Sequence, residues 1–213
     1  MTDLPIFTVA DGIASLILRQ IPARGEAYIL VRAVFGTQEG LLRECAGVCR
    51  AAGAESIFVG GTGDFSSYPV YARLMERSIR RTLLPAADLK IRPVTPETVS
   101  HWAAVYHERF SAVPAAQLCT PRELRELPEN GEAFFLSDEQ TEVGIGRVRG
   151  DTVLAIAALR PGFGARVLSA AAAQCTADTV CLLCAMENLH AMKLYDRLGF
   201  SRDGIREIWH RLA

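Results

Sequence analysis

The sequence lacks an excess of charge of either sign and contains no long uninterrupted hydrophobic run. Its 213 residues carry 23 Lys and Arg against 24 Asp and Glu, a formal net charge of −1. A chain without a basic excess has little to hold a phosphate backbone, so we expect no nucleic-acid partner. No apolar stretch approaches the roughly 20 residues of a membrane-spanning helix, and the first residues lack the basic flank of a signal peptide. We therefore expect no membrane partner and a cytoplasmic location.

The sequence also lacks a metal-binding pattern, although it has six cysteines. Cys181 and Cys184 have CxxC spacing, yet they lie in the strand-like run VCLLCA, where positions three apart point to opposite faces. A metal site would also need a second pair of ligands, and only His190 is near in sequence. We expect reduced, buried thiols and no bound metal.

Half of the residues are hydrophobic, which is enough apolar material for one large globular domain or two small ones. The region from about residue 88 has the clearest pattern. Residues 90–94 predict a strand, 95–110 an amphipathic helix, 122–127 a second helix and 131–151 an antiparallel strand pair.

The next segment predicts a parallel strand–helix–strand unit. Residues 152–159 are a continuous apolar run of the kind found in a strand covered on both faces. A glycine-containing turn leads into the alanine-rich run 165–175, which favours helix, and residues 179–185 form another buried strand. The sequence thus predicts an α/β fold with a mixed sheet.

The same order of elements occurs earlier in the chain, at residues 27–35, 38–53 and 55–61. From Ala27 to Leu74 the sequence aligns without a gap on residues 124 positions later. The matches are Leu30 with Leu154, Ala33 with Ala157, Gly40 with Gly164, Ala46 with Ala170, Tyr71 with Tyr195, Arg73 with Arg197 and Leu74 with Leu198. Such self-similarity favours an internal duplication, the alternative being two independent units of a common type. We expect an N-terminal domain at 1–84, a linker at 83–88 and a C-terminal domain at 88–213.

The turn PGFGARVL combines two glycines with the start of a helix. Gly162 and Gly164 let the backbone approach a ligand closely, and the first amides of the helix face an anion with the favourable end of the helix dipole. The alternative is a glycine turn that serves only to reverse the chain.

The segment ENLHAMKLYDRLGF, residues 187–200, predicts a helix capped by Asn188 and ended by Gly199. By its spacing alone this helix is explained by core packing. Its pattern Asn-x-x-Ala-x-x-Leu-Tyr-x-x-Leu-Gly-Phe, placed after a strand–helix–strand unit, closely resembles the segment that ends the acetyl-CoA site of GCN5-related N-acetyltransferases. The resemblance covers about residues 88–213.

The resemblance implies a site and a reaction. The pantetheine arm of acetyl-CoA would pair with the backbone of Ile156, Ala157, Ala158 and Leu159, and the pyrophosphate with the amides of Gly162, Phe163, Gly164, Ala165 and Arg166. Asn188 would face the pantetheine, and Tyr195 would be the general acid that protonates the departing thiolate. The reaction implied is direct transfer of an acetyl group to a primary amine of a small molecule or peptide.

Some positions depart from the family pattern. Leu159 stands where the family usually has Arg or Gln, and residues 152–159 contain no carboxylate to act as base. Glu142, Asp151 and Glu187 are candidate substitutes, the alternative for each being an ordinary solvated charge, and no base is predicted. The N-terminal copy departs further, so we expect it to be incomplete and to bind no cofactor. Two hypotheses follow: an N-acetyltransferase, or a catalytically silent module of the same fold that binds a ligand or partner.

Overall fold

A computed structural model describes residues 5–86 and 88–213, and the chain divides into two compact units. The N-terminal unit comprises the chain up to Arg73 together with Arg206–Ala213, and the C-terminal unit comprises Leu74–Ile205. The predicted linker at 83–88 therefore lies inside the C-terminal unit, and residue 87 of it is outside the described residues.

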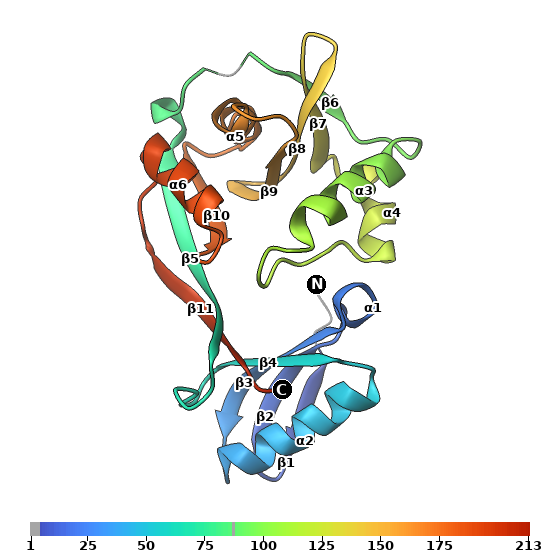
Figure 1. The fold of residues 1–213 in the computed structure, drawn as a ribbon, viewed down its shortest axis with the longest axis vertical. Coiled ribbons are helices and arrows are strands. Elements are labelled where there is room, and N and C mark those ends of the chain that lie inside the picture. Colours follow the sequence, from blue (N-terminus) through green and yellow to red (C-terminus); the bar gives the residue numbers. More distant parts are fainter. Residues whose placement is uncertain (1–4, 87) are drawn as a thin grey trace. The chain divides into compact units, whose positions relative to one another are not determined.

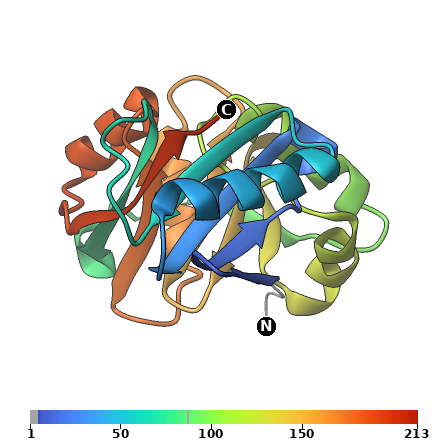
Figure 2. The ribbon, with the colours of Figure 1, turned by 90° about the horizontal axis from the view of Figure 1, so that it is seen from below.

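The N-terminal unit is a mixed sheet with one long helix on a face. Its elements are β1 (Ile6–Val9), β2 (Gly12–Ile17), α1 (Ile21–Arg24), β3 (Glu26–Val34), α2 (Gln38–Ala51), β4 (Ser56–Gly61) and the end of β11 (Gly204–Arg211). The strand order is β1-β2-β3-β4-β11, with β3 and β4 parallel and the other pairs antiparallel. The apolar side of α2 packs on this sheet, as Figures 1 and 2 show, because Leu41, Cys45 and Cys49 recur at helical spacing and are fully buried.

The C-terminal unit is a six-stranded sheet between two helical layers. Its elements are β5 (Val70–Arg80), a 3₁₀ turn (Arg81–Leu83), β6 (Lys90–Pro93), α3 (Val99–Phe110), α4 (Pro121–Asn130), β7 (Ala133–Asp138), β8 (Thr141–Arg149), β9 (Thr152–Ala158), α5 (Gly164–Ala172), β10 (Thr179–Ala185) and α6 (Leu189–Leu198). The strand order is β5-β10-β9-β8-β7-β6, and β9 with β10 is the parallel pair. One core lies between the sheet and α5 and α6, and another between the sheet and α3 and α4 (Figure 1).

The predicted mixed α/β fold is confirmed, and so are the strand–helix–strand units at β3-α2-β4 and β9-α5-β10. One part of the predicted repeat is wrong. Tyr71 lies in the strand β5, whereas Tyr195 lies in the helix α6, so the two tyrosines are not structurally equivalent. The predicted alignment of residues 71–74 on 195–198 therefore compares a strand with a helix.

The C-terminal unit takes one strand of its sheet from the sequence that precedes the predicted linker. β5 pairs with β10 over seven residues, from Leu74↔Ala185 to Arg80↔Thr179. Arg77 of β5 is fully buried, and its guanidinium donates to the carbonyl oxygens of Phe200 at 2.7 Å and Ser201 at 2.9 Å. It also pairs with Asp196 of α6 at 2.6 Å. β5 is therefore part of the framework that holds α6.

No helix among the described residues is long and apolar enough to span a membrane. In the same part of the chain, no group of three or more His, Cys, Asp and Glu side chains is arranged to hold a metal ion. All six cysteines are free thiols, five of them buried.

Candidate active site

The parallel strands β9 and β10 are paired over a short length only. Their register comprises Thr152↔Cys181 and Val153↔Leu182, and no pairing between them is present in the described residues that follow. On its other side β9 stays paired with β8 as far as Ala158, and the amide of Leu159 donates to the Val143 carbonyl at 2.8 Å. Because backbone groups alternate in direction along a strand, those of Ile156 and Ala158 face the side where β10 has separated. They form a free strand edge inside the sheet.

The separation coincides with an irregularity in β9. The β8–β9 register passes from Val148↔Val153 to Arg147↔Ala155, so Leu154 is an extra residue without a partner in β8. A bulge of this kind bends the strand and changes where the following side chains point. Accordingly, Val153 belongs to the core under α5 and α6, while Ala155 belongs to the core under α3 and α4.

The first turn of α5 lies directly after the C-terminal end of β9 and has no capping side chain. By contrast α2, α4 and α6 are capped by Thr37, Thr120 and Asn188. The helix bonds of α5 begin with Val167 donating to Phe163, and the Phe163 amide donates to Arg160 at 3.4 Å. The first-turn amides that remain for an anion are those of the residues from Gly164 to Arg166.

Two glycines shape this turn. Gly162 has a backbone φ of +85°, a value that residues other than glycine rarely adopt. A Cβ on Gly164 would lie 3.3 Å from the Leu194 side chain, so the small residue lets α5 and α6 approach each other closely. The predicted glycine turn thus combines a left-handed position with a close contact between helices.

The side chain of Arg166 is directed away from an incoming anion by two carboxylates. It bonds to Asp88 at 2.7 Å and to Asp138 at 3.0 Å. These hydrogen bonds raise the pKa of Arg166 and lower that of Asp138. We therefore expect Arg166 to contribute its backbone amide to the site, and its side chain to fix the first turn of α5.

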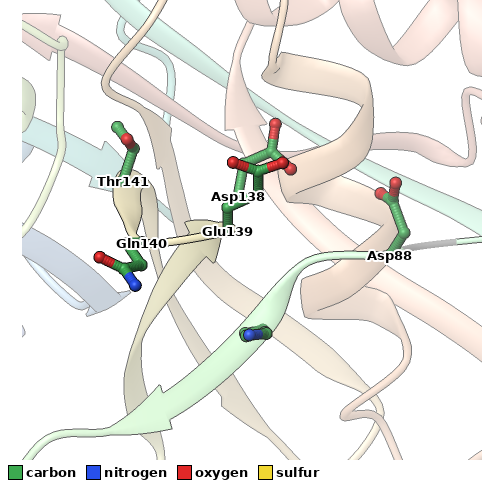
Figure 3. A pocket seen from close by; sticks show the side chains of 6 residues that line it. Asp88, Asp138, Glu139, Gln140 and Thr141 are labelled. Carbon is green, nitrogen blue, oxygen red and sulfur yellow. The ribbon is translucent and has the colours of Figure 1, made fainter.

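Asp88 and Asp138 also border a shallow hollow of about 470 Å³ between the start of β6 and the β7–β8 turn (Figure 3). Its other lining residues are Lys90, Glu139, Gln140 and Thr141. Its lining has three carboxylates and one lysine, and Asp88 and Asp138 are already paired with Arg166, so the hollow offers no excess of positive charge to an anionic cofactor.

Asn188 precedes α6 as its N-cap, and Tyr195 lies on the helix. The Asn188 side-chain oxygen accepts a hydrogen bond from the Ala191 amide at 3.3 Å, so this residue caps the helix through its oxygen. The carboxamide nitrogen takes no part in the cap. Tyr195 is 7% exposed and belongs to the core shared by β10, α5 and α6. Burial and the nearby Cys184 raise its pKa, and Arg77, 5.9 Å from the ring centre, opposes them. The phenol is therefore protonated at neutral pH.

The three carboxylates considered as bases differ in their surroundings. Glu142 bonds to His101 at 3.2 Å and to Arg92 at 3.5 Å. Asp151 accepts the Thr152 hydroxyl at the start of β9, the end opposite to α5. Glu187 lies between β10 and α6, next to Asn188.

The equivalent place in the N-terminal unit is closed. There the parallel pair β3–β4 is in register over six residues, from Glu26↔Ser56 to Val31↔Gly61, so the strands do not part. At the start of α2 the Asp11 carboxylate accepts the Thr37 amide at 2.8 Å, and a Cβ on Gly40 would collide with it. The Asp11 carboxylate therefore occupies the position that a bound anion would take at this helix start. The sequence did not predict this contact between Asp11 and Thr37.

Comparison with family models finds no match, and comparison with curated proteins finds none. Among solved structures the chain is similar to a conserved protein of unknown function from Staphylococcus epidermidis, with 13% identity and a TM-score of 0.61 over 99% of this chain and 94% of that one. It is also similar to a GCN5-related N-acetyltransferase from Kribbella flavida, with 14% identity and a TM-score of 0.56 over 96% of this chain and 58% of that one. A tandem GNAT protein from the clavulanic acid biosynthesis pathway has 11% identity and a TM-score of 0.50, over 95% of this chain and 79% of that one. At these identities the likeness shows the fold, which is that of the acyltransferase-like GNAT structures.

Proposed function

We propose that the protein is an acyl-CoA-dependent N-acyltransferase whose working site lies in the C-terminal unit. The observation that supports this most is the coincidence of a free strand edge at Ile156 and Ala158 with an uncapped helix start at Gly164. A cofactor with an amide-containing arm and a diphosphate matches both features, since the arm pairs with the strand and the diphosphate accepts from the helix amides.

In this proposal the backbone of β9 holds the pantetheine arm of acyl-CoA, acetyl-CoA being the simplest member, and the turn from Gly162 to Arg166 holds the diphosphate. The neutral nitrogen of a primary amine attacks the thioester carbonyl carbon. A C–N bond forms, the C–S bond breaks, the nitrogen releases one proton, and the thiolate of CoA takes up one proton. The amine proton passes to water.

Tyr195 is the proposed donor of the proton to the thiolate. It stays protonated at neutral pH because burial raises its pKa, and it lies on α6 beside Cys184 of β10, where the two strands are apart. Such a donor accelerates departure of the leaving group by typically 10²–10⁴-fold.

The N-terminal unit is proposed to be an incomplete copy of the same fold without a cofactor. The parallel strands β3 and β4 leave no free edge between them, and Asp11 occupies the helix start. A chain with one open site is expected to bind one CoA.

A titration of the whole protein with CoA tests the site, and Ala165→Pro sharpens the test. Proline is tolerated in the first turn of a helix, where its missing N–H has no helical partner, so this variant removes one amide from the anion site and leaves the helix intact. Loss of a hydrogen bond to a charged group costs about 1.5–3 kcal/mol, so CoA affinity should fall roughly tenfold to a hundredfold. Glu39→Pro makes the same change in the first turn of α2 and should leave CoA affinity unchanged. If the two variants bind CoA with equal affinity, the cofactor does not bind at the first turn of α5.

A second function, a ligand-binding module without catalysis, is favoured by one observation: β9 carries no carboxylate that could serve as base. It predicts stoichiometric binding of acyl-CoA without release of the CoA thiol in the presence of any amine. A panel of amines assayed by thiol release separates the two functions.

A further inference from the structure

Two leucines are exposed where β9 and β10 separate. Leu154 and Leu183 follow directly after the paired residues Val153 and Leu182, and their side chains are 40% and 48% exposed. Neither belongs to a hydrophobic core cluster of the described residues. Large aliphatic side chains left open at the inner end of a candidate site are a surface that a ligand can cover.

The two leucines lie on the same face of the sheet. In β10, the residues Val180, Leu182 and Cys184 point into the core under α5 and α6, so Leu183 points to the other face. In β9 the bulge turns Leu154 and the next residue, Ala155, toward the face that α3 and α4 cover.

Their distance from the anion site matches the length of the cofactor arm. From Leu154 to Leu159 the strand advances five residues, about 16 Å at about 3.3 Å per residue. An extended pantetheine arm has a comparable length, so a diphosphate held by the first turn of α5 brings the thioester to the level of the bulge. Atoms beyond the thioester then lie against Leu154 and Leu183.

The two strands themselves are apolar at this position, and the residue opposite Leu183 in the neighbouring strand β5 is Glu76. β9 reads TVLAIAA and β10 reads TVCLLCA, with no charged residue in either strand. The small residues Ala155 and Ala157 lie on the same face as the leucines. A charged or strongly polar acyl group would find no partner on these strands.

We propose that the site takes acyl-CoA with an aliphatic acyl chain longer than acetyl, and that the chain lies on Leu154 and Leu183. This inference rests on the proposed function and adds the class of acyl donor to it. Each methylene buried against apolar side chains strengthens binding by about fourfold. Because the two leucines cover part of the chain, we expect octanoyl-CoA to bind at least about tenfold more tightly than acetyl-CoA.

The experiment is calorimetric titration of the whole protein with CoA, acetyl-CoA, butyryl-CoA, octanoyl-CoA and succinyl-CoA, which requires no amine. Affinity should rise from acetyl to octanoyl, and succinyl-CoA, whose chain ends in a carboxylate, should bind no better than acetyl-CoA. Leu154→Asn and Leu183→Asn should each remove most of the dependence on chain length and leave the affinity for CoA itself unchanged. Leu83→Asn, which alters a leucine that is 67% exposed in the 3₁₀ turn of the same unit, is the control and should keep the dependence.

The outcomes separate the inference from the proposed function. Binding of CoA with the same affinity for acetyl and octanoyl donors, or a chain-length dependence that survives in both leucine variants, overturns the inference and leaves the acyltransferase proposal standing. Absence of any binding of CoA overturns both. If one leucine variant unfolds, as measured by circular dichroism, the other carries the test.

Discussion

Replacement of Arg77 by methionine tests whether β5 holds the helix that Asn188 caps and on which Tyr195 lies. Arg77 donates to the carbonyl oxygens of Phe200 and Ser201 and pairs with Asp196. Methionine keeps much of the aliphatic volume of arginine but offers no donor, so these acceptors lose the hydrogen bonds that Arg77 makes.

The cost follows from the burial of each acceptor. Phe200 is buried, and an unsatisfied buried carbonyl costs about 1–3 kcal/mol. Ser201 is exposed, so water can replace part of its lost bond. The Asp196 side chain is 40% exposed and keeps Arg202 at 2.8 Å, so loss of its pair with Arg77 adds little. We expect Arg77→Met to lower the free energy of unfolding by about 2–4 kcal/mol, which for a chain of this size lowers the melting temperature by roughly 5–15 °C.

Urea unfolding and a thermal melt measure this effect. Arg80→Met is the matched control: it is an exposed arginine in the same strand, and its loss should change stability by less than about 0.5 kcal/mol. A loss below about 1 kcal/mol for Arg77→Met, or equal losses for both variants, would show that β5 does not support α6 in the way described.

Three further predictions concern catalysis, folding and acid stability. Tyr195→Phe should lower thiol release with an active amine by about 10²–10⁴-fold with CoA affinity retained, while Tyr71→Phe leaves turnover unchanged; full activity of Tyr195→Phe refutes the proposed acid. A fragment of residues 74–205, which keeps most of β5, should melt cooperatively, whereas residues 88–213 should not, because β10 then has a bare edge; equal melts contradict this. Burial opposes ionisation of Glu132, but hydrogen bonds from Arg149 and Arg147 outweigh it and lower its pKa, so its contribution is present at neutral pH and lost as pH falls below about 4. The melting temperature of Glu132→Gln should therefore be lower than that of the unaltered protein at pH 7 and should approach it near pH 3, and a constant difference argues against this assignment.

The parts of the fold that the sequence predicted are those encoded locally. Asn188 and Gly199 mark the start and end of α6 in the sequence and cap it in the structure. The apolar run at β9 and the alanines of α5 likewise predicted a strand and a helix. These features depend on neighbours within a few residues, so pattern and propensity are sufficient.

The parts that the sequence did not predict depend on distant partners. β5 carries an arginine at a buried position, and the groups that satisfy Arg77 lie 119 to 124 residues away. The carbonyl of Met192, 115 residues away, is a further acceptor of Arg77. Without these distant groups a buried arginine contradicts the expected alternation of apolar residues. Asp11 reaches Thr37 across 26 residues, and no local pattern links a carboxylate in a hairpin turn to a helix start. The separation of β9 from β10 is also a property of pairing between segments.

The position of residues 206–213 has a consequence for the order in which the protein matures during synthesis. The strand β4 is made early, but its antiparallel partner in the same unit is β11, where Val59 faces His210 and Phe58 faces Arg211. Until the ribosome has produced those residues, β4 has an unpaired edge of backbone donors and acceptors next to buried apolar side chains. Domains commonly fold in order as they emerge, but this unit must wait about 150 residues for its last strand. A nascent chain of this kind is a substrate for chaperones that bind open strand edges, and stalled translation before residue 206 should leave an aggregation-prone product.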